Sequence, residues 1–289
     1  MTIPLLMVLL AAVLHASWNL LAKQAAAAGP AFVLANNFFA CVFYLPWVAW
    51  VIFNGGMSWS FPILACIAAS GLLHLAYSLA LQRGYQVADL SVVYPIARGS
   101  GPAIAAIGGF VLLAETPTLL RVAGLIAVVT GIGLIATQGN LARFREAGAR
   151  AGVRWGLLTG MLIAGYTVND AYGVKLLLIA PIILDWFGNT ARFAMLLPVV
   201  MARPDNARAA MRGHWGRAAI VGLISPLGYI LVLSALQMGA PLSLVAPARE
   251  LSMMVGTLLG IVILREAAGL WRIIGCAVLV AGVVLLGAS

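Results

Sequence analysis

Long uninterrupted apolar stretches constrain this chain more than any other feature. Ile104–Leu113 and Val278–Leu286, for example, are solidly apolar and do not alternate with polar residues. A strand of a membrane β-barrel would alternate over segments of about 10 residues, whereas a membrane-spanning helix needs about 20 mostly apolar residues. These stretches therefore predict membrane-spanning helices.

The composition excludes most other classes of protein. Apolar residues make up 63% of the 289 positions, and charged residues only 9%. A soluble domain carries roughly 25% charged residues, and a soluble protein this apolar would expose large apolar patches. A soluble enzyme and a disordered chain are both excluded. We expect an integral membrane protein whose main surroundings are the lipid bilayer.

Gly, Pro and charged residues divide the chain into ten apolar segments joined by mostly short connections. The fold class that we expect is therefore an all-α integral membrane protein with ten transmembrane helices. The expected helices are Ile3–Ala22, Ala31–Phe53, Phe61–Leu81, Leu90–Leu113, Leu119–Thr137, Val153–Val174, Pro181–Met201, Ala218–Met238, Leu242–Leu264 and Leu270–Gly287.

The second half of the chain repeats the first at a shift of 151 residues. Charged residues are rare here, so three matched charges in one register indicate a real repeat. Each half holds five expected helices, an odd number, so the second half enters the membrane from the opposite side. We expect two inverted repeats, residues 1–138 and 153–289, joined by a basic linker at 139–152 and surrounding a central cavity. The matched charges are Arg98 with Arg249, Glu115 with Glu266, and Arg121 with Arg272.

The repeat also carries a family pattern. Each half ends in a helix containing Pro, a Glu, an Arg, and a last helix with spaced glycines. The residues are Tyr94-Pro95, Glu115, Arg121, Gly124 and Gly131 in the first half, and Ala246-Pro247, Glu266, Arg272, Gly275 and Gly282 in the second.

Over nearly its whole length the chain resembles the drug/metabolite transporter superfamily, in its ten-helix EamA-like branch. The resemblance implies a basket of ten helices around a central cavity and the export of small metabolites, most often amino acids and related compounds. The chain departs from the pattern in one place. Members usually have an Arg near the start of the second helix of each half; Arg192 fits this in the second half, but Asn36-Asn37 stands there in the first.

The basic residues predict an orientation. If both termini lie on one side, the loops of that side hold two Lys or Arg residues and the opposite loops hold twelve. Lys and Arg concentrate in cytoplasmic loops. We therefore expect both termini outside a bacterial inner or plasma membrane, although the resemblance favours termini inside. These loops also account for the net charge of +9, and no basic face with interleaved aromatic residues indicates nucleic acid.

Four charged residues fall at membrane depth: Arg98, Asp170, Arg249 and Glu250. Charge at this depth is costly, so each residue is a candidate for function. Their charges sum to zero, which permits two ion pairs that hold the halves together. They could equally form a substrate or proton site, and the two interpretations are compatible.

Polar and aromatic residues share faces of several helices. His15, Trp18 and Asn19 occupy one face of the first helix, and Tyr166, Asn169 and Asp170 repeat that spacing in the sixth. We interpret both sets as cavity lining, with packing between helices as the alternative. The further candidates for substrate binding are His74, Tyr77, Tyr94 and Tyr229.

Two prolines and two further charges complete the candidates. Pro95 and Pro247 interrupt equivalent helices, so they are candidate hinges, with a static kink as the alternative. Asp185 is expected in the first turn of its helix, where the helix dipole favours an acid. Arg192 lies seven residues further on.

The chain lacks the sequence motifs of hydrolases and nucleotide-binding proteins, and we expect no metal and no cofactor. We expect a secondary transporter that works by alternating access, with Glu250 and Asp170 able to carry a proton if transport is coupled. The alternatives are a carrier of nucleotide-linked or lipid-linked sugars and, in another class, an intramembrane enzyme. The oligomeric state stays open.

Overall fold

The computed structural model describes residues 2–55, 59–88, 90–145, 149–264 and 269–288, and all regular structure in these ranges is helical. The first half contains α1 (Thr2–Gln24), α2 (Gly29–Phe53), α3 (Phe61–Val87), α4 (Leu90–Leu112) and α5 (Leu119–Thr137). The second half contains α6 (Ala149–Lys175), α7 (Pro181–Met201), α8 (Pro204–Ala210), α9 (Trp215–Gln237), α10 (Leu242–Ala248), α11 (Leu251–Leu264) and α12 (Leu270–Gly287). Short 3₁₀ turns, η1 (Ala26–Ala28) and η2 (Leu141–Arg145), lie in the connections.

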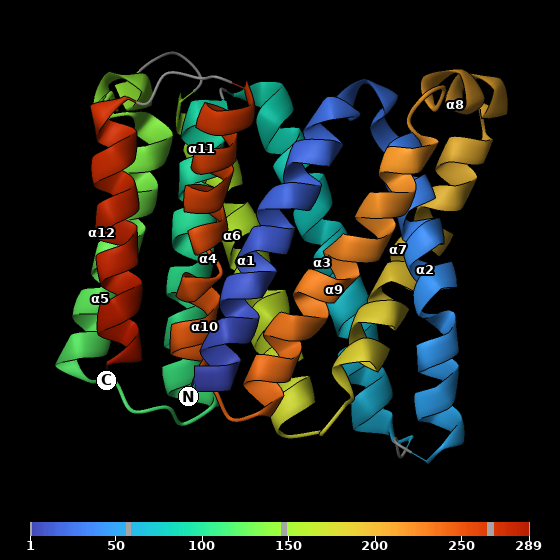
Figure 1. Cartoon of the computed structure of the whole chain (residues 1–289), viewed down its shortest axis with the longest axis horizontal. Coiled ribbons are helices and arrows are strands. Elements are labelled where there is room, and N and C mark those ends of the chain that lie inside the picture. The colour runs from blue at the N-terminus through green and yellow to red at the C-terminus, as the bar shows by residue number, and fades with distance from the viewer. Residues whose placement is uncertain (1, 56–58, 89, 146–148, 265–268, 289) are drawn as a thin grey trace.

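The long helices lie side by side, and seven segments of the described chain are long and apolar enough to cross a membrane (Figure 1). Large apolar side chains cover the outside of the bundle. Phe53, Phe61 and Leu119 are 88%, 83% and 90% exposed. Such a surface is stable only against lipid tails, so the chain is an all-α integral membrane protein.

Both chain ends lie at one end of the bundle, whereas α8 lies at the opposite end (Figure 1). Most of the loop arginines belong to this second end. We call the two ends the termini end and the basic end. The side chains of Lys23, Arg143, Arg145, Arg265 and Glu266 are outside the described part of the chain.

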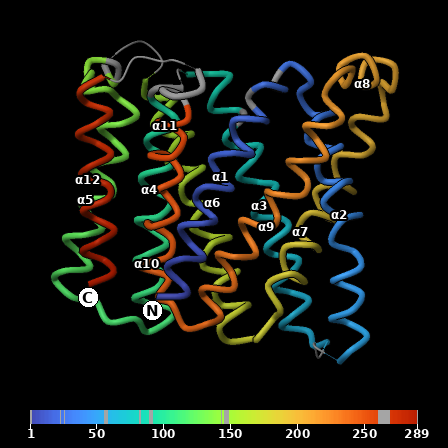
Figure 2. The backbone as a smooth tube through the Cα atoms, viewed as in Figure 1, coloured from blue at the N-terminus to red at the C-terminus, as the bar shows by residue number. Residues whose placement is uncertain are grey.

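The segment expected as one helix over Leu242–Leu264 contains a single candidate membrane span, Leu242–Leu259, but it is divided into two helices, α10 and α11, placed end to end (Figure 2). Between them the backbone bonds tighten to an i→i−3 pattern, from Glu250 N to Pro247 O (3.0 Å) and from Met253 N to Glu250 O (2.9 Å). Pro247 has no N–H to donate in the preceding turn. Arg249 and Glu250 therefore occupy a break between two helices.

Glycines allow α5 and α12 to pack closely. A Cβ on Gly131 would approach Leu279 N to 2.7 Å, and one on Gly282 would approach Val128 N to 2.7 Å. Only glycine permits two helix backbones to come so near each other. The spaced glycines of the two final helices thus meet one another.

Equivalent helices of the two halves make equivalent contacts. The helix α1 packs on α9 as α6 packs on α3, and α2 packs on α9 as α7 packs on α3. Likewise α4 packs on α6 as α11 packs on α1. Other close pairs, such as α2 with α7, α4 with α10 and α5 with α12, join helices at the same position in the two halves. The pattern is repeated only in part, because α6 and α7 also contact α9, whereas the described residues show no comparable contacts of α1 and α2 with α3.

Candidate functional site

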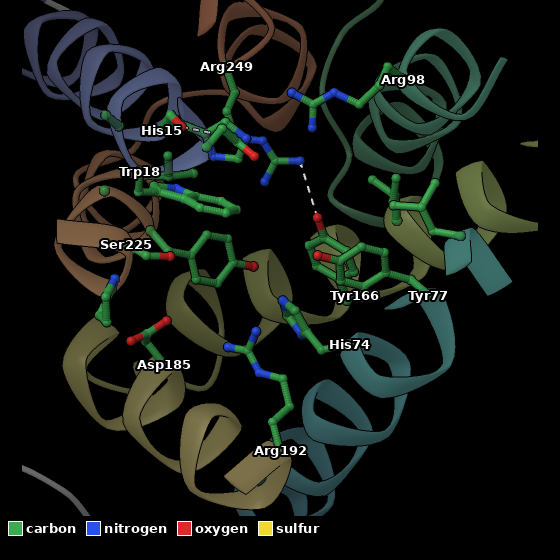
Figure 3. A pocket seen from close by; sticks show the side chains of 18 of the residues that line it. His15, Trp18, His74, Tyr77, Arg98, Tyr166, Asp185, Arg192, Ser225 and Arg249 are labelled. Atoms are coloured by element: carbon green, nitrogen blue, oxygen red, sulfur yellow. Dashed lines mark hydrogen bonds between the residues drawn. The ribbon is translucent and has the colours of Figure 1, made fainter. Parts of the chain in front are cut away.

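A cavity of about 350 Å³ is lined by side chains of both halves (Figure 3). The first half contributes side chains from α1, α3 and α4, and the second half from α6, α7, α9 and the break after α10. The lining residues are Ala11, His15, Trp18, Asn19, His74, Tyr77, Leu81, Tyr85, Tyr94, Ala97, Arg98, Ile163, Tyr166, Asp185, Asn189, Arg192, Ser225, Pro226, Gly228, Tyr229, Val232 and Arg249.

The cavity reaches toward the basic end. Asn19, Leu81 and Tyr85 belong to the last turns of α1 and α3, which end there, and Tyr85 is 37% exposed. Toward the termini end the interior is filled by aliphatic side chains that are at most 1% exposed. These are Ile179, Leu184, Leu233, Leu236 and Leu242.

The termini end is also tied by an acid from the first half. The carboxylate of Glu115 accepts hydrogen bonds from the backbone N–H groups of Leu242 and Ser243, the latter at 2.9 Å. Lys175 Nζ lies 3.5 Å from the same carboxylate and donates to Ala240 O at 3.0 Å. This cluster joins the end of α4 to α6 and to the start of α10.

Aromatic rings form one wall of the cavity. His74 stacks on Tyr166 with ring centroids 3.9 Å apart, and Tyr229 meets His74 edge-on at 5.6 Å. Across the cavity, His15 and Trp18 are in edge contact at 4.9 Å. Rings held this way present flat apolar faces to whatever occupies the space.

Ten of the thirteen residues expected to bind substrate line this one cavity. Their role in binding stays a prediction. The other three, Asn169, Asp170 and Glu250, lie behind the cavity wall. The ten are His15, Trp18, Asn19, His74, Tyr77, Tyr94, Arg98, Tyr166, Tyr229 and Arg249.

The four intramembrane charges form one ion pair, not two. Arg98 Nε lies 2.9 Å from Glu250 Oε2, at an angle too bent for a hydrogen bond, and Arg98 also donates to Ser252 Oγ at 3.3 Å. Asp170, fully buried, instead accepts hydrogen bonds from Tyr229 Oη (2.6 Å) and Asn169 Nδ2 (3.0 Å).

Arg249 has no carboxylate within ion-pair distance among the described residues. It is 6% exposed, and one terminal nitrogen donates to Tyr166 Oη at 3.5 Å. Its Nε is buried without a hydrogen-bond partner. The side chain points into the cavity (Figure 3).

The cavity also contains three residues of α7 that the sequence analysis did not place there. Asp185, Asn189 and Arg192 follow one another at spacings of four and three, and therefore share a helix face. Asn189 Nδ2 donates to Asp185 Oδ2 at 2.8 Å, and Arg192 donates to Asn189 Oδ1 at 2.9 Å. The first-turn placement of Asp185 was wrong, since α7 begins at Pro181. The shared face was the signal that could have found these residues.

The two candidate hinges differ in structure. Pro95 lies inside α4, which continues as a helix, whereas Pro247 lies one residue before the end of α10. Whether either residue moves stays a prediction.

The fold and cavity define a class: an all-α membrane protein with a polar, aromatic-walled cavity between its halves. Residues 150–288 match the model of the EamA-like transporter family, which confirms the resemblance found in the sequence for this part of the chain. Fold, cavity and match together identify a membrane transporter of small solutes.

One solved protein, titled "Crystal structure of protein", is similar over 99% of this chain and 97% of its own, with a TM-score of 0.75 and 14% identity. At this identity the likeness concerns the fold alone. No curated protein sequence matches the chain.

Proposed function

We propose that this protein is a secondary transporter that exports small metabolites by alternating access between two inverted five-helix repeats. The repeats are residues 1–138 and 153–289, joined by the basic linker. The helix contacts that recur in both halves support this assignment, such as α1 on α9 and α6 on α3. Inverted repeats place a solute site at their interface. Amino acids and related compounds are the first class to test.

The observation that carries the proposal is the asymmetry of the cavity. Its lining reaches the last turns of α1 and α3 at the basic end, while buried aliphatic side chains and the Glu115 cluster fill the termini end. A solute site accessible from one side only is what one state of an alternating-access carrier requires. If the basic loops are cytoplasmic, this is the state that loads a solute for export.

The broken helix supports the same proposal. Transporter sites often lie where a membrane helix is discontinuous, since the freed backbone can face a cavity and the two half-helices can move separately. The break at Arg249 and Glu250 adjoins both the cavity and the candidate hinge Pro247. The sequence contains no nucleotide-binding motif, so we propose a solute or proton gradient as the energy source, with Glu250 and Asp170 as proton carriers.

The volume of the cavity favours a small solute over a nucleotide-linked or lipid-linked sugar. About 350 Å³ is near the lower end of the 300–1,000 Å³ range typical of pockets for drug-sized ligands. Flux in proteoliposomes separates a transporter from an intramembrane enzyme, because a transporter delivers its solute chemically unchanged.

The decisive experiment measures access to the cavity from each side. In a variant without Cys41, Cys66 and Cys276, Ser225→Cys places one thiol in the cavity wall. Impermeant maleimide should label it from the basic end, and from the termini end once transported solute is supplied. Thr159→Cys, at a fully buried position, is the control that should stay unlabelled. Labelling from one side only under every condition would reject alternating access.

A further inference from the structure

Arg249 is a buried cation, and no carboxylate of the described residues lies within ion-pair distance of it. It lies at the break between α10 and α11 and is 6% exposed. The only hydrogen bond of its side chain in the described structure is the 3.5 Å contact to Tyr166 Oη. Its Nε has no partner. An unpaired charge at such a place is costly unless a ligand supplies the opposite charge.

The neighbouring acids are engaged elsewhere. Glu250, next in the chain, pairs with Arg98 at 2.9 Å, and Asp170 accepts from Tyr229 and Asn169. The guanidinium of Arg249 therefore faces the cavity with donors to spare. A guanidinium matches the geometry of a carboxylate, which can accept two parallel hydrogen bonds from it.

The residues around Arg249 indicate the chemistry of the rest of the ligand. The Tyr166 and His74 rings stack on one another beside it, and Trp18 faces them across the cavity (Figure 3). These surfaces suit a flat, uncharged body. A carboxylate is the strongest partner for an ammonium group, and Asp185, the one acid among the lining residues that the structure describes, already accepts from Asn189 and shares its helix face with Arg192.

We propose that the cavity binds a small organic carboxylate, whose carboxylate group is held by Arg249 and whose flat uncharged body lies against the aromatic wall. The proposal rests on the proposed transport function and narrows its substrate class. It favours anionic acids over zwitterionic amino acids, because Arg249 is available to an anion while no free carboxylate among the described lining residues is available to an ammonium group.

The test compares ligands that differ only in charge. The full-length purified protein is titrated calorimetrically with 3-phenylpropanoate and benzoate, with the amides of both, with 3-phenylpropylamine and with phenylalanine. The two carboxylates should bind, and the amides and the amine should bind at least about 10-fold more weakly, since each lacks the charge-assisted hydrogen bonds. Equal affinity for carboxylates and amides, or no binding of either carboxylate by folded protein, would overturn the proposal. Tighter binding of phenylalanine than of 3-phenylpropanoate would show that the site prefers a zwitterion, and would also overturn the proposal.

Substitutions test whether Arg249 is the residue that binds the carboxylate. Arg249→Gln should abolish the preference for carboxylates, with an affinity loss of about 10- to 100-fold, while Arg150→Gln, an exposed arginine at the start of α6, should change nothing. Tyr166→Phe keeps the ring of the aromatic wall and removes the hydroxyl that accepts from Arg249, so carboxylate affinity should rise. If Tyr166→Phe abolishes carboxylate binding, the tyrosine and not the arginine is the receptor.

Different results would contradict the proposed carboxylate site and the proposed transport mechanism. If the cavity thiol at position 225 is labelled from both sides in turn while no carboxylate is preferred, the protein is a carrier of another solute class. If carboxylates bind but access never alternates, the site is real and the transport mechanism is wrong.

Discussion

Arg98 in α4 and Glu250 at the break after α10 form an ion pair of 2.9 Å that joins the two halves at mid-depth. The glutamate is 1% exposed and the arginine side chain 16% exposed. Because the pair crosses the cavity wall, it both stabilises this arrangement of the halves and restrains their movement.

Removing one partner of this pair should destabilise the protein. Glu250→Gln leaves Arg98 without its counter-charge, which costs about 3–5 kcal/mol for buried pairs. The double variant Arg98→Gln/Glu250→Gln should recover part of the loss. Thermal melts of all four proteins in one detergent measure the coupling. Additive losses would show that the pair is not a unit, and normal flux by folded Glu250→Gln protein would exclude Glu250 as the proton carrier.

Asn169 and Tyr229 should prove to hold Asp170 in place. Asn169 Nδ2 bridges Cys66 O (3.0 Å) and Asp170 Oδ1, and Tyr229 donates to the other oxygen at 2.6 Å. Tyr229→Phe removes a hydrogen bond to a buried acid and should cost about 1.5–3 kcal/mol of stability. Asn169→Ala should also lower the melting temperature. Asn19→Ala, at the exposed mouth of the cavity, is the control with little expected change in stability.

The Glu115 cluster should act as the closure of the termini end. Glu115→Gln removes the charge that Leu242 N–H, Ser243 N–H and Lys175 share. We expect faster maleimide labelling of the Ser225→Cys thiol from the termini end. Asp205→Asn, in α8 at the basic end, removes an exposed acid and serves as the control. Unchanged labelling in Glu115→Gln protein would show that the aliphatic side chains alone close this end.

The orientation is tested at exposed positions of each end. Asn140→Cys and Ala209→Cys at the basic end should be shielded from impermeant label in intact cells, whereas Ser60→Cys at the termini end should be labelled. A reporter that is active only outside the cytoplasm should be active after Ser289. The opposite pattern would reverse the assignment, and the cavity would then open outward.

The sequence was sufficient for the class of fold and for ten of the 22 residues that line the cavity. Apolar stretches can be recognised without any tertiary contact, because each membrane helix satisfies its own backbone in lipid. The helical face shared by His15 and Trp18, and that of Tyr77 with His74, follow from spacing alone. The family resemblance, carried by Pro, Glu, Arg and spaced glycines, also came from the sequence.

Tertiary packing determined which partner each inward-facing side chain contacts, because helical periodicity does not specify it. Asn169 and Asp170 share a face with Tyr166, yet that face is wide enough for Tyr166 to reach the cavity while the other two contact α3 and α9. Glu250 pairs with Arg98, and no such pairing joins Asp170 to Arg249, because partner choice depends on distances across helices. The break at Arg249 likewise appears only in the folded chain, since Pro95 and Pro247 have the same sequence signal but only the second ends its helix. Periodicity determines which side chains can face inward, and the packing of the two halves determines what each one meets there.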